Sequence, residues 1–303
     1  MLPGRAALTL LAICVCAARA DTRAALAEGD PTAFLSAADW ATAQRKAGRT
    51  AALMRAPQGV PAVVIVPHHA PAADLILAGL DAALEGRARA PVRVILLAPD
   101  HRHVATGPAM TSDRDWHTTR GRVRADGAAV LDITRGKLVA THRAVATEHG
   151  LGTVMPVLAD RLPGVPVLPV AIRSDLNASE ARALAGELAP WARGALIVAA
   201  VDFSHGLGLQ AAHRADRESL DALRGMDQSA FLAWGSDHTD GAGALPVALE
   251  LARRLNASTF ELGARSNSHR IGGPVTDVTT YIVGFVSPDP RIVSSAVSRS
   301  DSP

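Results

Sequence analysis

Imidazole side chains follow three apolar segments of this sequence, at the point where each segment ends. His68 and His69 come after the segment at 60–66, His101 after the segment at 92–97 and His205 after the segment at 195–201. Asp202 stands close before His205. Neutral imidazole is the commonest metal ligand in proteins, and a carboxylate completes such a site or orients a ligating histidine. These residues therefore predict a metal-binding site with acid–base groups beside it.

The apolar segments predict strands buried on both faces, as in a parallel sheet, because their β-branched residues run on without alternation. Four such segments occur, at residues 60–66, 92–97, 165–172 and 195–201. Leucine and alanine at helical spacing over residues 72–88 predict a helix between the first two, and hence a βαβ unit. In open α/β sheets, ligands bind at the carboxyl ends of the strands. The histidines should therefore lie together at this edge.

The rest of the chain predicts helices and closing strands around that sheet. Asn177 is expected to cap a helix, with Glu180 completing a capping box. Other helices are expected at 151–162, 208–224, 227–235 and 242–255, and closing strands at 259–262 and 279–286. Residues 100–145 are less regular and predict an extended excursion from the sheet edge. The predicted fold class is α/β, with a central, mostly parallel sheet and helices on both faces.

The start of the chain has the features of an export signal. Arg5 precedes an apolar run at 6–18, and Ala18-Arg19-Ala20 fits a small-x-small cleavage site. We therefore expect a signal peptide at residues 1–20 and an exported, periplasmic protein; the alternative is an uncleaved N-terminal anchor. The remaining chain divides into a helical N-terminal segment at 21–58, an α/β domain at 59–288 and a disordered tail at 289–303.

Cleavage would change the chemistry available to the mature chain. Cys14 and Cys16 would both leave, which excludes disulfides and cysteine nucleophiles. Arg5 and Arg19 would leave too, so that Lys plus Arg falls from 31 to 29 against 29 acidic residues, a formal net charge of 0. Neither a nucleic-acid partner nor a stable membrane span is expected. A small-molecule substrate or ligand is the expected partner.

Four short motifs occur in order along the chain: Val66-Pro67-His68-His69, Ala98-Pro99-Asp100-His101, Glu148-His149 and Val201-Asp202-Phe203-Ser204-His205. This ordered set resembles the Memo-like family, whose bacterial members are called AmmeMemoRadiSam system protein B. The resemblance runs from about residue 59 to residue 288. It implies a fold similar to class III extradiol dioxygenases, which open catechol rings with Fe(II) held by two histidines and one glutamate.

The resemblance also implies roles for individual residues. His68 and His101 match metal or pocket residues of the family, and Asp202 and His205 match its Asp-Phe-x-His segment. We therefore expect His205 to act as a general acid or base that Asp202 orients. His69, Glu148 and His149 are expected to bind the cofactor or to line its site.

The chain departs from the family pattern at two places. The family's third metal ligand is a cysteine, and counting back from Pro246 puts Ala242 at its position. The second Glu and His of another family segment fall on Gly152 and Val154. Asp240, which precedes Ala242 closely, is the expected substitute ligand. The expected cofactor is a divalent metal, Fe(II) with Cu or Zn as alternatives, and a site without metal is the other possibility.

Two functions of different classes remain open from the sequence. One is a metal-dependent, dioxygenase-like oxidoreductase, and the other is an exported, non-catalytic protein that binds a metal ion or small molecule. A hydrolase using Ser204 and His205 is disfavoured, because adjacent side chains do not easily face each other and no nucleophile elbow frames the serine.

Two local structural alternatives also remain. Asp202 could cap a following helix, and His213 with Asp216 could form an exposed helical pair.

Overall fold

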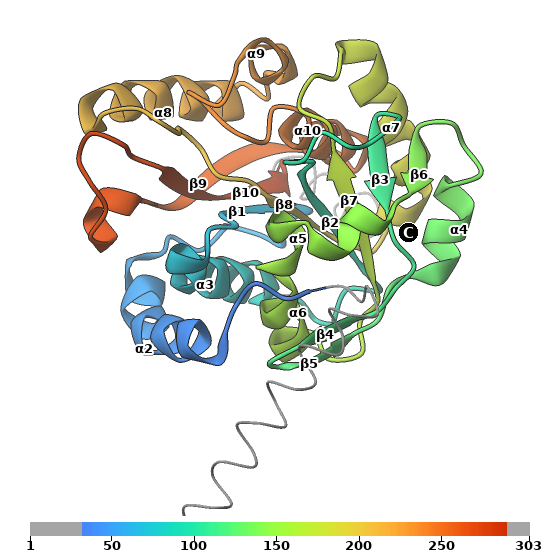
Figure 1. The fold of residues 1–303 in the computed structure, drawn as a ribbon, viewed down its shortest axis with the longest axis horizontal. Coiled ribbons are helices and arrows are strands. Elements are labelled where there is room, and N and C mark those ends of the chain that lie inside the picture. Colours follow the sequence, from blue (N-terminus) through green and yellow to red (C-terminus); the bar gives the residue numbers. More distant parts are fainter. Residues whose placement is uncertain (1–31, 290–303) are drawn as a thin grey trace, which may run out of the picture.

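A computed structural model describes residues 32–289 of the chain (Figure 1). The predicted signal peptide at 1–20 lies outside the described residues, as do residues 21–31 and 290–303. The predicted domain boundaries therefore stay predictions. Among the helices of the described part, none is long and apolar enough to cross a membrane.

Eight strands form one mixed sheet in the order β6-β3-β7-β2-β8-β1-β10-β9. Their bounds are β1 (Val63–Val66), β2 (Val94–Pro99), β3 (Ala109–Thr111), β6 (Val139–Thr141), β7 (Val167–Ile172), β8 (Leu196–Ala200), β9 (Ala257–Asn267) and β10 (Thr280–Pro288). The central strands β7, β2, β8 and β1 run parallel to one another. β10 and β9 close one side antiparallel, and β3 pairs antiparallel with β7 at the other. The four strands predicted from the sequence are thus confirmed as the centre of the sheet.

Helices cover both faces of the sheet. α7 (Ala178–Ala192), α10 (Ala244–Arg254), α8 (Leu209–Arg224), α9 (Gln228–Ala233) and α4 (Gly127–Ile133) share one buried cluster. α2 (Ala37–Leu53), α3 (Ala73–Leu84) and α6 (Met155–Arg161) share the cluster on the opposite face. The remaining short helices are η1 (Ala70–Ala72), η2 (Arg143–Thr147), α5 (His149–Gly152) and η3 (Ser268–Ile271). This arrangement confirms the predicted α/β fold class.

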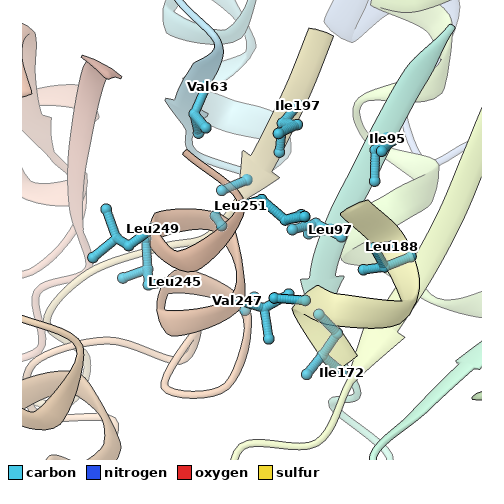
Figure 2. Close-up of a cluster of buried hydrophobic side chains, with 14 of the residues drawn as sticks. Val63, Ile95, Leu97, Ile172, Leu188, Ile197, Leu245, Val247, Leu249 and Leu251 are labelled. Carbon is cyan, nitrogen blue, oxygen red and sulfur yellow. The ribbon is translucent and has the colours of Figure 1, made fainter. Parts of the chain in front are cut away.

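Strand residues alternate between the two clusters. Val63 and Ile65 of β1 face α10 together with Ile197 of β8 (Figure 2), whereas Val64 and Val66 face the opposite layer. All are fully buried. Burying one such aliphatic side chain contributes about 1.5–3 kcal/mol, so this two-sided burial fixes the central strands rigidly and holds their carboxyl ends in place.

The irregular region and one helix differ from the prediction. Within 100–145, β3 and β6 extend the main sheet, and β4 (Trp116–Thr118) pairs with β5 (Gly121–Val123) as a separate hairpin. These strands are three residues long, too short to show alternation in the sequence. The helix expected at 151–162 divides into α5 and α6, with Pro156 in the first turn of α6. β9 is longer than expected and runs along the sheet edge.

The N-terminal helix is shorter than the predicted segment. α2 begins after Ser36, which forms a capping box with Asp39, and ends at Leu53. The chain beyond it is extended along β9, where the Arg55 N–H donates to the Gly263 carbonyl oxygen at 2.9 Å. The predicted capping box of Asn177 and Glu180 is confirmed at the start of α7.

Candidate metal centre

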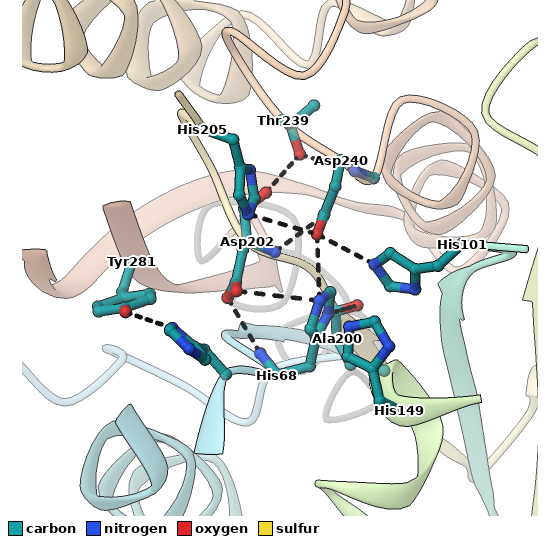
Figure 3. Close-up of polar contacts among 12 residues, drawn as sticks. His68, His101, His149, Ala200, Asp202, His205, Thr239, Asp240 and Tyr281 are labelled. Carbon is teal, nitrogen blue, oxygen red and sulfur yellow. Dashed lines mark hydrogen bonds and ion pairs between the residues drawn. The ribbon is translucent and has the colours of Figure 1, made fainter. Parts of the chain in front are cut away.

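His68 leaves β1 in one fixed orientation. Its side chain is buried, and its backbone N–H donates to Asp202 Oδ1 at 3.1 Å. Its Nδ1 lies 3.0 Å from the Ala200 carbonyl oxygen at the end of β8. A carbonyl only accepts, so Nδ1 must carry a proton. Nε2 is therefore the atom that can bind a metal, and it faces Asp240 Oδ2 at 3.1 Å (Figure 3).

His101 is oriented in the same way from the end of β2. Its Nδ1 lies 2.7 Å from Glu148 Oε1, and its Nε2 lies 3.3 Å from Asp240 Oδ2. Glu148 is buried at the start of α5 and also accepts the backbone N–H groups of His101 and Gly150. A carboxylate on the remote nitrogen is the usual partner of a metal-binding histidine. Glu148 thus acts on the site through His101.

Gly150 makes this close arrangement possible. A Cβ at this position would lie 3.4 Å from both His68 Nδ1 and His101 Cε1, and 3.0 Å from the Ala98 side chain. The contact with Ala98 would be tighter than an ordinary van der Waals contact, so that α5 or β2 would have to shift by a few tenths of an ångström. The glycine therefore lets α5 sit directly against the two rings.

Asp240 stands between the imidazoles on the loop before α10. Its Oδ1 accepts the Asp202 N–H at 3.0 Å, and its N–H donates to the Asp202 carbonyl oxygen at 3.2 Å. Thr239 Oγ1 donates to the same carbonyl oxygen at 2.9 Å. Glycines at 241 and 243 allow this approach, because a Cβ there would overlap Val201 and the Arg173 carbonyl oxygen respectively. The loop is thereby fastened across the end of β8.

Asp202 and His205 lie beside this group, but no hydrogen bond joins their side chains in the described structure. Asp202 is buried, and its Oδ2 lies 3.9 Å from His68 Nε2. His205 Nε2 lies 4.0 Å from Asp240 Oδ2, and its buried Nδ1 has no hydrogen-bond partner among the described residues. The alternative that Asp202 caps the following helix is excluded, because α8 begins after Gly208.

The remaining predicted residues surround the same centre. The His149 ring centroid lies 3.9 Å from that of His101 and 5.1 Å from that of His68, and its side chain is about half exposed. His69 Nδ1 lies 2.6 Å from Tyr281 Oη. His205 is also partly exposed, so the site is reached from solvent.

Burial and the charges of neighbouring side chains shift the pKa values of several groups in the site. Burial alone would lower the pKa of His68, but Asp240 and Asp202 outweigh it and raise that pKa to about 10. Burial opposes ionisation of Asp240, yet His68 and His101 hold its pKa well below the usual range. Burial raises the pKa of Asp202. Burial, then the charges of His101 and His68, lower the pKa of His149 to about 4.

Two groups of three side chains lie close enough to share one ion. They are His68 with His101 and His149, and His68 with Asp202 and Asp240. The predicted ligand set of His68, His101 and Asp240 draws on both groups. Imidazole nitrogens with carboxylate oxygens suit Fe, Zn or Cu, so the residues present fit a divalent transition metal.

Of the three family residues that this chain lacks, the structure explains the loss at Gly152 but not the loss at Ala242. Gly152 stands where the family has a second Glu, and a Cβ there would overlap the Phe34 ring and the Thr32 carbonyl oxygen. The chain at Thr32 and Phe34 occupies the space that a side chain at position 152 would need. Ala242 is buried and offers no donor atom, and nothing in the structure explains the loss of the family's cysteine.

Fold and site together define an α/β protein that gathers histidines and carboxylates at the carboxyl ends of adjacent parallel strands. Residues 46–285 match the family model described as Memo-like protein. This covers more than half of the chain, so the chain belongs to the Memo-like family, which confirms the resemblance inferred from its motifs.

Proteins that are named as MEMO1 family members agree with this assignment. A MEMO1 family protein of Methanothermobacter thermautotrophicus is 24% identical over 203 residues, 64% of this chain and 72% of the relative. MEMO1 family proteins of Nitrosopumilus maritimus and Thermotoga maritima are 26% and 24% identical, over 64% and 65% of this chain and 72% and 71% of their own. A crystal structure of an uncharacterized Escherichia coli protein aligns with a TM-score of 0.48 and 11% identity, over 74% of this chain and 98% of that one.

The sequence analysis did not identify Tyr281 as a residue beside the site, and the exposed position that it left open for Asp216 is wrong. Tyr281 was not connected with His69, although it is the only tyrosine of the chain and lies in a predicted strand. Asp216 is not an exposed partner of His213. It is buried under β10, where it accepts from Thr280 Oγ1 at 2.5 Å and Ser204 Oγ at 3.4 Å. Helical spacing shows which residues share a face, but not whether that face is covered.

Proposed function

We propose that this chain binds one divalent metal ion through His68, His101 and Asp240 and uses it as a dioxygenase-like oxidoreductase. One observation carries the proposal. The Nδ1 atoms of both histidines are engaged by acceptors, and both Nε2 atoms turn toward the same oxygen of Asp240. Such orientation of two imidazoles by remote acceptors is what a metal site requires.

The donor set favours Fe(II). Two histidines and one carboxylate with open positions are typical of non-haem iron oxygenases, while Zn and Cu are the alternatives. The metal would supply a Lewis acid and, if it is iron, an electron source for reaction with oxygen. Asp240 would take the place that the cysteine has in the family, since Ala242 has no donor atom.

The residues around the ligands have distinct tasks in this proposal. His205 is the general acid or base, because its Nε2 is near the ligands and its side chain reaches solvent. Asp202 stabilises charge on His68 and fixes its backbone. Glu148 orients His101. His149 and His69 line the position of the ligand.

The location of this chemistry is part of the proposal. The charged start, apolar run and small-x-small site within residues 1–20 support export to the periplasm of a bacterium. N-terminal sequencing of the protein recovered from periplasmic extract should begin at Asp21. Recovery of the full-length chain with the membranes would instead support an uncleaved anchor.

The test of the metal site is elemental analysis of residues 21–303. Protein purified and reconstituted anaerobically with Fe(II), Zn or Cu should retain about one metal per chain. The double variant His68→Ala, His101→Ala should retain none, and Asp240→Ala should lose most of it. A matched double variant, His117→Ala with His269→Ala, removes two exposed histidines away from the site and should keep the metal. Full metal in Asp240→Ala would exclude that residue as a ligand.

A second function, non-catalytic binding, is favoured by one specific observation. Asp240 Oδ2 lies 3.1 Å from His68 Nε2 and 3.3 Å from His101 Nε2, so this carboxylate pairs with both imidazoles without an ion. Oxygen consumption by the metal-loaded protein with a panel of catechols separates the two functions. Turnover that is lost in His205→Gln supports the oxidoreductase, whereas binding without oxygen consumption supports the binding protein.

A further inference from the structure

His69 and Tyr281 form a pair that supplies no metal ligand in the proposed site. His69 follows His68 directly, and Tyr281 lies in β10 with its side chain fully buried. The two side chains meet through Tyr281 Oη and His69 Nδ1 at 2.6 Å, with ring centroids 5.8 Å apart. In the described structure this is the hydroxyl's only hydrogen bond.

The buried hydroxyl decides where the proton of this contact lies. A phenol that is removed from water must donate its proton to an acceptor or lose the energy of that hydrogen bond. His69 Nδ1 is the acceptor within reach, so the O–H donates and Nδ1 accepts. If Nδ1–H donated instead, the tyrosine proton would be left buried without an acceptor. The neutral imidazole of His69 must therefore carry its own proton on Nε2.

The neighbouring His68 has the opposite arrangement. Its Nδ1 keeps a proton, because it faces the Ala200 carbonyl oxygen, and its Nε2 can offer a lone pair to a metal once the proton shared with Asp240 has left. Adjacent histidines thus present different groups at the same edge of the sheet. Burial lowers the pKa of His69, and the charges of Asp202, His68 and His205 also act on it, so His69 belongs to the same electrostatic environment.

We propose that Tyr281 is a positioning residue that holds His69 as the Nε2–H tautomer, so that His69 offers a hydrogen-bond donor to an oxygen of the bound ligand. His69 Nε2 has no hydrogen-bond partner among the described residues, and the side chain is only partly buried. This N–H is therefore open to an incoming molecule. A neutral N–H close to the bound metal cation favours a negatively charged oxygen as acceptor, such as that of a phenolate or a carboxylate. The ligand role rests on the proposed function, whereas the tautomer does not.

The first arm of the test is ring nitrogen NMR on metal-free, ¹⁵N-histidine-labelled protein at pH 8. His69→Gln identifies the signals of His69. Wild type should show Nε2 protonated and Nδ1 unprotonated, and Tyr281→Phe should give a mixture of both tautomers while the His68 signals stay unchanged. Ser287→Ala, which removes a buried hydroxyl from the same strand, is the matched control and should leave His69 unchanged. Protonated Nδ1 in wild type, or an unaltered tautomer in Tyr281→Phe, would overturn the proposal.

The second arm measures binding of nitrocatechol to the metal-loaded protein by its visible absorption. His69→Gln should weaken binding roughly fivefold to tenfold, the effect of losing one hydrogen bond, with metal content unchanged. Tyr281→Phe should weaken binding less, because part of His69 keeps the Nε2–H tautomer. Unchanged affinity in both variants would refute the ligand role of His69. Failure of the wild type to retain metal would count against the proposed function, and the NMR arm would still decide the tautomer.

Discussion

Replacing Asp240 by asparagine tests the electrostatic account of the site in the absence of metal. The amide keeps the volume of the side chain but removes the charge that lies 3.1 Å from His68 Nε2. The pKa of His68 is raised in the folded protein, so its stabilisation is complete below about 6.5 and is lost as the pH rises through about 10. The pKa of Asp240 is depressed, so its stabilisation is present above about 3.8 and is lost as the pH falls further. Both contributions are therefore full between about pH 4 and 6.5.

The size of the effect follows from the pKa of His68. The difference between about 10 and 6.5 corresponds to roughly 5 kcal/mol, at about 1.4 kcal/mol for each tenfold change in proton affinity. Asp240 and Asp202 share this stabilisation, and Asp240 contributes the larger part. Breaking one partner of a buried ion pair costs about 3–5 kcal/mol in other proteins. We therefore expect Asp240→Asn to lower the free energy of unfolding by about 3 kcal/mol at pH 6.

The assay is urea unfolding of metal-free protein in chelator at pH 6 and at pH 10. The free energy of unfolding of Asp240→Asn should be about 3 kcal/mol below that of the wild type at pH 6. The difference should be clearly smaller at pH 10, where His68 of the wild type loses its proton. Asp237→Asn is the matched control, since it removes an exposed carboxylate from the same loop and should change stability little. Equal stability of Asp240→Asn and wild type at pH 6 would refute the assigned ion pair.

Four further outcomes are expected. Glu148→Gln should weaken metal binding by about 10- to 100-fold, measured by competition with a chelator, because His101 loses the carboxylate that orients it; unchanged affinity would show that His101 needs no such partner. Apparent metal affinity should rise with pH toward about 10, with protons released on binding, because the ion must displace the proton of His68; calorimetry in two buffers measures this release, and its absence would contradict the raised pKa. Gly243→Ala should destabilise the protein by more than about 2 kcal/mol, because its Cβ would overlap the Arg173 carbonyl oxygen; wild-type denaturation would mean that the loop can move freely. Ile197→Ala should cost about 2–5 kcal/mol in chemical denaturation, since the side chain is fully buried in the central strand, and a cost below about 1 kcal/mol would contradict the packing of β8.

The central sheet was predictable because its strands are buried on both faces. Such strands are continuous apolar runs, which the sequence displays directly at β1, β2, β7 and β8. Short strands such as β3 and β6 have no such signal, since three residues are too few for any periodicity. For that reason the predicted excursion from the sheet edge missed that β3 and β6 join the main sheet, whereas β4 and β5 do stand apart from it.

The sequence by itself determined which residue types stand at the carboxyl ends of the strands. His68, His101 and His205 each follow a buried strand, and their order with Glu148-His149 indicated the family. These features are local, because a strand and the residue after it are neighbours in the chain. No long-range information is needed to recognise them.

Only the tertiary structure decided how these residues meet. β8 lies between β1 and β2 although it follows both in the chain, and this insertion brings Ala200 and Asp202 to His68. The loop carrying Asp240 crosses the end of β8 because its glycines allow backbone contact. Hydrogen bonds between residues more than 30 positions apart depend on strand order and on close packing, and neither is encoded in local spacing. The ring nitrogens that carry protons in His68 and His69 follow from such partners and therefore depend on the fold.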